Sequence, residues 1–174
     1  MVSVRILEEQ VVNQIAAGEV VERPAAVVKE LVENALDANG TVITVQLKNG
    51  GRSLIRVVDD GVGMNRQDAL MCLERHATSK ILSAADLKKV ATLGFRGEAI
   101  PAIASVSRFT LITRPEEEEL GTKVHIEGGR LVDVSATGCA PGTEVTVRSL
   151  FYNTPARRKF MRTRQTELAH CMEA

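Results

Sequence analysis

The segment from residue 29 to residue 38 carries polar side chains whose types and spacing suit catalysis. Glu30, Asn34 and Asp37 are four and three residues apart, so on a helix they lie on one stripe. The stripe offers a carboxylate that can act as a base, an amide oxygen that can bind a metal, and a second carboxylate. An ordinary solvated helix face is the alternative interpretation of this stripe taken alone.

The rest of this helix is predicted from its apolar residues and its end signals. Six apolar residues are expected to fill the side opposite the polar stripe: Val27, Val28, Leu31, Val32, Ala35 and Leu36. Pro24 suits the first helical turn, where its missing N–H is not needed, and Asn39-Gly40 is a stop signal. We therefore predict a helix from residue 24 to about residue 37.

Four further motifs follow along the chain and carry the first family resemblance. They are Asp59-Asp60-Gly61-Val62-Gly63, Thr78-Ser79-Lys80, Gly94-Phe95-Arg96-Gly97-Glu98-Ala99-Ile100 and Gly142-Thr143. Together with Glu30 and Asn34, and in this order, they resemble the Bergerat-type ATP site of the GHKL superfamily. Type II topoisomerase ATPase subunits, heat-shock ATP chaperones, sensor histidine kinases and MutL mismatch-repair proteins share that site.

Two other segments narrow the resemblance to the bacterial MutL family. Residues 13–24 and 150–160 resemble MutL signatures, and the resemblance runs from about residue 5 to the last residue. It implies DNA mismatch repair, with a slow Mg²⁺-dependent ATPase that gates dimer closure. The implied partners are a MutS-type mismatch-recognition protein, DNA contacted through its backbone, and a second copy of the chain. The implied location is the bacterial cytoplasm, at the nucleoid during repair.

The resemblance and side-chain chemistry together give the principal motifs their expected roles. Glu30 is the expected general base, because a carboxylate can orient a water beside the γ-phosphate and accept its proton. Asn34 is the expected Mg²⁺ ligand, since Mg²⁺ prefers hard oxygen donors. Asp59 is expected to accept a hydrogen bond from the amino group of adenine. The hydroxyl of Thr143 is expected to help hold the base.

The neighbours of these residues are assigned supporting roles. Asp37 either reaches waters around the nucleotide or is a solvated residue at the helix end. Gly61 and Gly63 let the backbone turn and approach the base closely, although a plain turn is the alternative for this motif alone. Glu33 is expected on the flank of the helix and ranks below Glu30 as a base. Asp60 is expected to be a solvated turn residue.

The phosphates of ATP are expected to be held by two segments. Gly94, Phe95, Arg96, Gly97, Glu98, Ala99 and Ile100 resemble a phosphate loop that leads into a helix N-terminus. Lys80, with Thr78 and Ser79, is expected to close over the phosphates from a lid spanning residues 76–97. A surface lysine is the alternative interpretation of Lys80. The loop is not a Walker A motif, because its G-x-x-x-x-G-K-[ST] pattern is absent.

A basic run near the end of the sequence is the candidate contact for DNA phosphates. Its members are Arg157, Arg158, Lys159, Arg162 and Arg164. Such a run can bind phosphates without reading sequence. The alternative is that these side chains brace the sheet or an adjoining domain.

Composition limits the possible classes of protein. The 174 residues suit one domain, and 22 basic and 22 acidic residues give zero net charge, so any argument for nucleic acid must be local. The three cysteines form no C-x-x-C pair, which argues against a zinc site or a disulfide framework. No apolar run is long enough to span a membrane. The histidines, His76, His125 and His170, lack metal-binding spacing.

The pattern of helices and strands predicts an α+β fold. Strands are expected at residues 43–47, 54–58, 107–113, 122–127, 131–135 and 143–149, and further helices at 11–17, 65–75 and 98–105. The strand at 43–47 should have one buried face, and Asn49-Gly50 should form a hairpin turn. The elements should make a two-layer sandwich, with helices on one face of a mixed, mostly antiparallel sheet.

The domain organisation and the competing functions complete these expectations. We expect a single ATPase domain over residues 1–174, with an N-terminal arm at 1–17, that stops before a second domain that supplies a lysine. A binding module with negligible turnover is therefore an alternative to an active ATPase. A histidine kinase ATP-binding domain is a remote alternative, because residues 94–100 and 151–160 do not suit it.

Overall fold

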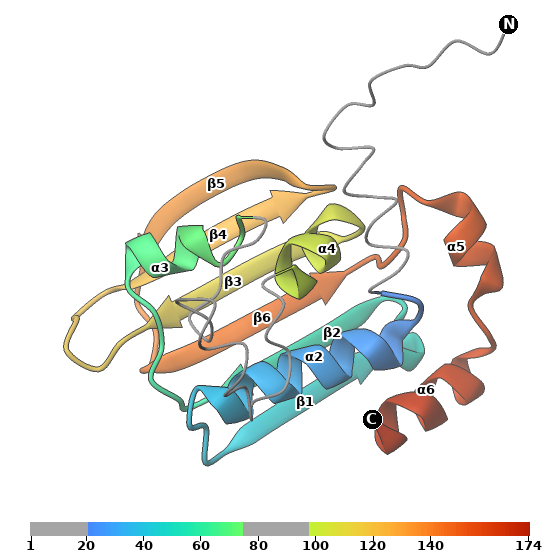
Figure 1. Cartoon of the computed structure of the whole chain (residues 1–174), viewed down its shortest axis with the longest axis horizontal. Coiled ribbons are helices and arrows are strands. Elements are labelled where there is room, and N and C mark those ends of the chain that lie inside the picture. Colours follow the sequence, from blue (N-terminus) through green and yellow to red (C-terminus); the bar gives the residue numbers. More distant parts are fainter. Residues whose placement is uncertain (1–20, 75–97) are drawn as a thin grey trace, which may run out of the picture.

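The computed structural model describes residues 21–74 and 98–174, and the fold is shown in Figure 1. Its helices are α2 (Pro24–Asp37), α3 (Arg66–Met71), α4 (Ala99–Ser105), α5 (Pro155–Phe160) and α6 (Arg164–Glu173), with a 3₁₀ turn, η1 (Asn49–Gly51). Its strands are β1 (Ile43–Lys48), β2 (Leu54–Asp59), β3 (Arg108–Arg114), β4 (Gly121–Glu127), β5 (Arg130–Thr137) and β6 (Gly142–Arg148). The expected N-terminal arm (1–17), with its helix at 11–17, and the whole of the expected lid (76–97) lie outside the described residues.

A single sheet of six strands forms the base of the fold. Its strand order is β1-β2-β6-β3-β4-β5, and every pairing among the described strands is antiparallel. Helices α2, α3 and α4 lie over one face of this sheet (Figure 1). The α+β architecture with helices on one face is therefore confirmed, and the sheet is antiparallel in all of its described pairs rather than mixed.

The core lies between the sheet and these helices. Side chains of α2 and α4 pack with the inward-facing residues of the central strands, which alternate along each strand. The largest fully buried apolar side chains include Phe109, Phe151, Ile55, Ile103 and Leu111. Each buried side chain of this size contributes about 1.5–3 kcal/mol by leaving water, so this layer holds α2 and α4 on the sheet.

The sheet register brings four residues into line at one end of the strands. Asp59 on β2 is opposite Thr143 on β6, and Thr143 is opposite Thr113 on β3. Thr113 is in turn opposite Thr122 on β4. Polar residues that are far apart in the sequence therefore share one end of the sheet, next to the C-terminal end of α2.

Three predictions about local structure need correction. No residue of β1 is buried, because β1 is an edge strand and α2 covers it only in part; even Val45, on the helix side, is 39% exposed. Leu36 is 55% exposed. It follows Leu31 by five residues, and about 100° per residue places it about 140° away from the core-facing side. Helix α3 ends at Met71, short of the predicted residue 75.

Helices α5 and α6, near the end of the chain, have no counterpart among the predicted elements. Helix α6 packs against η1 and α2, beyond the ends of the strands (Figure 1). Gly50 permits this contact, since it has φ +65° and a Cβ there would be 2.5 Å from the carbonyl oxygen of Arg164. Glu167 of α6 is 1% exposed, and its Oε1 accepts a hydrogen bond from the backbone N–H of Arg162.

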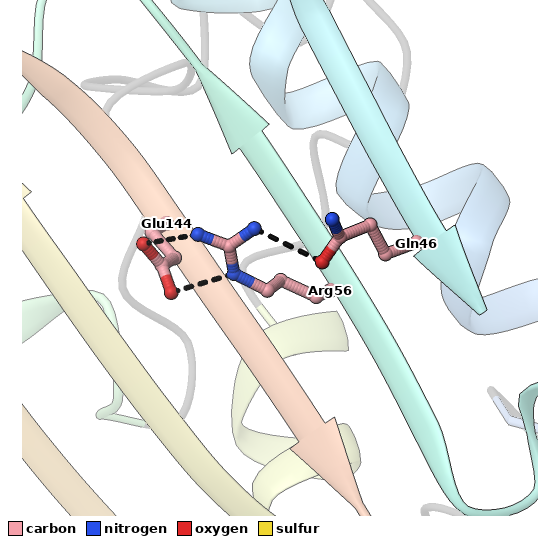
Figure 2. Close-up of polar contacts among 3 residues, drawn as sticks. All are labelled: Gln46, Arg56 and Glu144. Atoms are coloured by element: carbon pink, nitrogen blue, oxygen red, sulfur yellow. Dashed lines mark hydrogen bonds and ion pairs between the residues drawn. The ribbon is translucent and has the colours of Figure 1, made fainter. Parts of the chain in front are cut away.

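The other face of the sheet carries polar and charged side chains. Figure 2 shows Arg56 of β2 between Glu144 of β6 and Gln46 of β1. Its Nε and Nη2 donate to the two carboxylate oxygens of Glu144 at 2.8 and 3.0 Å, and its Nη1 donates to Gln46 Oε1 at 3.0 Å. The hydrogen bonds to Glu144 raise the pKa of Arg56 above its usual value. No helix among the described residues is long and apolar enough to cross a membrane.

Candidate functional site

Helix α2 presents the polar stripe predicted from the sequence. Glu30, Asn34 and Asp37 are all half-buried, whereas Val27 and Leu31 on the core side are buried. The helix begins at Pro24 and ends at Asp37, as predicted, and Asn39 adopts φ +61° just beyond it. The stripe is therefore held on a rigid element that the core fixes in place.

Glu33 is more buried than its predicted flank position implied. Its exposed fraction is only 8%, while Glu30 is half-buried. Glu33 Oε1 lies 4.0 Å from the ammonium of Lys29, one turn earlier on the same helix. The helix thus carries two acidic side chains, Glu30 and Glu33, in different surroundings. Replacing each in turn tests which of them is the general base.

The C-terminal end of α2 is fastened to the loop that follows β2. The backbone N–H of Val62 donates to the carbonyl of Ala38 at 2.9 Å. Gly61 lies so close to this helix end that a Cβ would be 2.5 Å from the same carbonyl oxygen. The Asn34–Asp37 end of the stripe is therefore held beside Asp59, which is the last residue of β2.

Asp59 combines burial with backbone hydrogen bonds. Its side chain is 9% exposed, and Oδ1 accepts the N–H of Gly61 at 2.8 Å. Burial raises the pKa of Asp59 above its usual value, while hydrogen bonds from the backbone N–H groups of Gly61 and Thr143 oppose that rise and the charge of Asp60 adds to it. The site therefore holds an oriented carboxylate in a poorly hydrated position, where a hydrogen bond is stronger than in water.

Thr143 is joined to a threonine that sequence reasoning missed. The hydroxyl oxygens of Thr143 and Thr113 are 2.9 Å apart. Thr113 is fully buried, and its Oγ1 also accepts the backbone N–H of Met64 at 2.9 Å and donates to the carbonyl of Gly142 at 3.1 Å. A threonine in a strand is too common to attract notice, and only the β3–β6 register could have identified this one.

The second glycine of the Asp59 loop has a structural role that was not predicted. Gly63 has φ +67°, and a Cβ there would overlap the carbonyl oxygen of Arg114 on β3. Gly63 and Gly61 thus allow the loop to pack against β3 and α2. Close approach of the loop to a base stays a prediction.

Asp60 is exposed, as predicted, but it is also firmly hydrogen-bonded. Its Oδ1 accepts the backbone N–H groups of Thr41 and Val42 at 2.7 and 2.9 Å, and its Oδ2 accepts the hydroxyl of Thr41 at 2.7 Å. The hydrogen bonds from Val42 and Thr41 lower the pKa of Asp60 to about 2. Asp60 therefore ties the start of β1 to the loop that carries Asp59.

The phosphate-binding candidates are only partly described. Glu98 immediately precedes α4, and Ala99 and Ile100 form its first turn; all three are half-buried. Helix α4 lies on the same face of the sheet as α2 (Figure 1). The other candidates lie outside the described residues: Thr78, Ser79, Lys80, Gly94, Phe95, Arg96 and Gly97.

The basic run is divided between two short helices at the end of the sheet opposite Asp59. Arg158 and Lys159 are exposed on α5, and Arg162 and Arg164 are exposed beyond it, whereas Arg157 is half-buried. On the neighbouring strands, Arg108 and Arg148 are directly opposite each other and both are exposed. Like charges in this position repel, and Glu127 on β4, which is opposite Arg108 on its other side, supplies one neighbouring negative charge.

Metal ligands are not clustered in the described part of the chain. Within residues 21–74 and 98–174, no group of three or more histidine, cysteine, aspartate or glutamate side chains could hold a metal ion. His125 instead contacts the hydroxyl of Thr110 at 2.9 Å and Glu127 at 3.2 Å on the polar face of the sheet.

Comparison with known proteins adds sequence and structural relatives. Residues 22–130 match the family described as histidine kinase-, DNA gyrase B- and HSP90-like ATPases. The chain is 60% identical to the DNA mismatch repair protein MutL of Acidobacterium capsulatum, over 96% of this chain and 25% of that protein. It is 62% identical to MutL of Geobacter sulfurreducens, over 96% of this chain and 28% of that protein. The chain thus spans about a quarter of the length of these relatives.

Solved structures with the same fold agree with these relatives. The Aquifex aeolicus MutL ATPase domain complexed with ADP superimposes with a TM-score of 0.69 at 37% identity, covering 88% of this chain and 53% of that one. The N-terminal domain of a DNA repair protein superimposes with a TM-score of 0.77 at 29% identity, covering 92% of this chain and 46% of that one.

Proposed function

Because the chain belongs to the histidine kinase-, DNA gyrase B- and HSP90-like ATPase family, as an ATPase domain of MutL type, we propose that its substrate is Mg²⁺-bound ATP and that it hydrolyses ATP slowly. The nucleotide lies between the polar stripe of α2 and the Asp59 end of the sheet. This proposal rests on the hydrogen bond from the backbone N–H of Val62 to the carbonyl of Ala38, which joins these two elements.

Asp59 and Thr143 form the base end of the proposed site. The ionised Asp59 carboxylate only accepts hydrogen bonds, and adenine has an exocyclic amino group that donates them. Backbone N–H groups of Gly61 and Thr143 already hold this carboxylate in position. The adenine amino group therefore meets an acceptor that needs no reorientation on binding.

Glu30 acts as the general base in the proposed mechanism. It is held on α2 one turn before Asn34, and its half-buried carboxylate orients a water and takes its proton. Asn34 offers a neutral amide oxygen for Mg²⁺, and Asp37 orients waters around the nucleotide. Bound Mg²⁺ would supply neutralisation of charge on the phosphates. A neutral ligand fits this role because it adds no negative charge beside the triphosphate.

Two segments complete the proposed site at the phosphates. Residues 94–100 cradle them with backbone N–H groups, and Lys80, with Thr78 and Ser79, closes over them from the lid at residues 76–97. Most of these residues lie outside the described part of the chain, so their roles rest on the family resemblance. The description of the Aquifex relative as an ADP complex supports a nucleotide site in this domain.

The whole-protein function that we propose is that of a mismatch-repair matchmaker. ATP binding gates closure of a dimer, in which the arm at residues 1–17 takes part, and so controls engagement of a MutS-type partner. The relatives that carry the name DNA mismatch repair protein MutL support this role in a bacterial cytoplasm. A further domain after the ATPase core supplies a lysine to the γ-phosphate in this proposal.

DNA is the second proposed macromolecular partner. Its phosphates contact the exposed basic side chains of α5 and the residues after it, next to the facing pair Arg108 and Arg148. Arg108 also lies over the ring of Tyr152, 5.1 Å from its centroid, which holds its guanidinium near the start of α5. Contact with backbone phosphates alone gives binding without sequence preference.

A nucleotide-gated binding module with negligible turnover is the competing function. Single-turnover hydrolysis by this chain, compared with that by a protein extended beyond residue 174, separates the two. Equal and measurable Mg²⁺-dependent rates support the ATPase proposal, whereas hydrolysis by the extended protein alone supports the binding module. Absence of ATP binding by both proteins contradicts the proposed function.

A further inference from the structure

We infer that Thr113 is a positioning residue that makes the hydroxyl oxygen of Thr143 a pure hydrogen-bond acceptor, so that the site prefers a 6-amino purine to a 6-oxo purine. This inference rests on the proposed function, because it concerns the base end of the same nucleotide site. Thr113 itself is fully buried and acts through Thr143.

The hydrogen-bonding capacity of Thr113 fixes the direction of its contacts. A threonine hydroxyl has one proton to donate and two lone pairs to accept with. The carbonyl of Gly142, 3.1 Å away, can only accept, so the proton of Thr113 points to it. The backbone N–H of Met64, 2.9 Å away, can only donate and takes one lone pair of Thr113.

The remaining lone pair of Thr113 determines the state of Thr143. The two hydroxyl oxygens are 2.9 Å apart, and the proton of Thr113 is already used, so Thr143 must donate. In the reverse arrangement, the proton of Thr113 would point to Thr143. The hydroxyl oxygen of Thr113 and the carbonyl oxygen of Gly142 would then face each other with no proton between them. That arrangement is disfavoured for a side chain with no access to water.

As a consequence, the side chains at the base end of the site present only hydrogen-bond acceptors. Thr143 has used its proton on Thr113, so its hydroxyl oxygen presents lone pairs only. Asp59, across the β2–β6 register from Thr143, also only accepts when it is ionised. The two N–H bonds of a 6-amino group can donate to both of these acceptors, whereas a 6-oxo purine has one donor on this edge, its ring N1–H, and brings a further acceptor at position 6.

The test compares ATP with ITP, which carries a 6-oxo base, by direct binding to the whole chain. In Thr113→Val, the hydroxyl of Thr143 is released and can turn to donate, so the preference for ATP over ITP should fall about tenfold. Thr113→Ser keeps the hydroxyl and should keep the preference. Thr110→Val is the matched control, since Thr110 is on the same strand and contacts His125 instead.

A change common to both nucleotides indicates a merely structural role. If Thr113→Val weakens ATP and ITP by the same factor, the inference is overturned while the proposed function stands. If the wild-type chain binds no ATP, the proposed function fails, and this inference fails with it.

Neutron diffraction on the deuterated wild-type protein provides a second test, which does not depend on the folding of a variant. Deuterium between Thr113 Oγ1 and the carbonyl of Gly142, and between Thr143 Oγ1 and Thr113 Oγ1, is the expected result. A deuterium of Thr143 that points away from Thr113 overturns the inference.

Discussion

The backbone N–H of Thr143 donates a hydrogen bond to the carboxylate of Asp59, across the pairing of β6 with β2. This bond joins residues that belong to two distant motifs of the sequence. It places an oriented acceptor beside the end of α2, where Asn34 and Asp37 lie. The arrangement makes the roles of the helix, the carboxylate and the surrounding surfaces separately testable.

Replacing Glu30 by Gln should slow ATP hydrolysis about a hundredfold or more while leaving ATP binding in place. The amide keeps the size of the side chain but cannot accept the proton of the attacking water. Single-turnover rates and a separate binding titration measure the two effects. Glu33→Gln, on the same helix, is the matched control and should hydrolyse ATP at close to the wild-type rate. A loss of turnover in Glu33→Gln but not in Glu30→Gln would assign the base to Glu33.

Replacing Asp59 by Asn should weaken ATP binding about 10- to 100-fold without lowering stability at neutral pH. Burial raises the pKa of Asp59 in the folded protein, so ionisation of this side chain opposes folding. The protonated side chain therefore contributes its full stabilisation at low pH, and this contribution disappears as the pH rises through the folded pKa. The neutral amide avoids this destabilisation and keeps an oxygen for Gly61.

Thermal unfolding of Asp59→Asn and wild type, measured across the acidic to neutral range, checks this sign. The advantage of the variant should be greatest at neutral pH and should shrink as the pH falls. Wild-type ATP affinity should also decrease in acid, as Asp59 takes up a proton and loses acceptor character. A variant that is less stable at neutral pH, with unchanged ATP affinity, contradicts this account of Asp59.

Replacing Gly63 by Ala should lower the free energy of unfolding by about 2 kcal/mol or more. The positive φ of Gly63 disfavours a side chain, and the new Cβ would overlap the carbonyl oxygen of Arg114. Gly138→Ala is the control, since a Cβ there meets nothing within 4 Å, and its effect should stay within about 0.5 kcal/mol. Equal effects of the two substitutions, measured by denaturant unfolding, would remove this explanation of the Asp59 loop.

Replacing both Arg158 and Lys159 by Ala should weaken binding to DNA of any sequence. Both side chains are exposed on α5, so their removal leaves the core intact. In a plot of log affinity against log salt concentration, the slope should decrease by about 1 for each phosphate that the variant no longer binds. Lys123→Ala removes an exposed cation from β4 and serves as the control. An unchanged slope in the double variant places any DNA-binding surface elsewhere.

The elements of this fold could be predicted where local signals act alone. Helix α2 can be located because Pro24 and Asn39-Gly40 mark its ends, and the strands because their apolar residues alternate. The predicted buried face of β1 is only partly buried: Ile43 and Leu47 pack against the core, but alternation does not reveal that a strand is at the edge of the sheet. Helices α5 and α6 escape prediction because α5 exposes its basic residues and α6 is held by contacts with η1 and α2.

The residues of the candidate site could be predicted only where they belong to a recognisable sequence motif. Glu30, Asn34 and Asp59 stand in recognisable patterns, and the structure places the end of the α2 stripe beside Asp59. Thr113 has no such pattern, since its contacts depend on the register of β3 against β6. The hydrogen bonds that Asp60 accepts from the Thr41–Val42 backbone depend on tertiary structure in the same way.

The most direct test of the central claim is a thermal-shift titration with a non-hydrolysable ATP analogue, with and without Mg²⁺. Ligand at about a hundred times its dissociation constant should stabilise the wild-type chain by about 2.7 kcal/mol, a shift of a few degrees. Asn34→Ala should lose the Mg²⁺-dependent part of the shift, whereas Gln46→Ala, which removes an amide from the polar face of the sheet, should keep it. No shift for the wild-type chain, or the same Mg²⁺ dependence in Asn34→Ala, would contradict the proposed site.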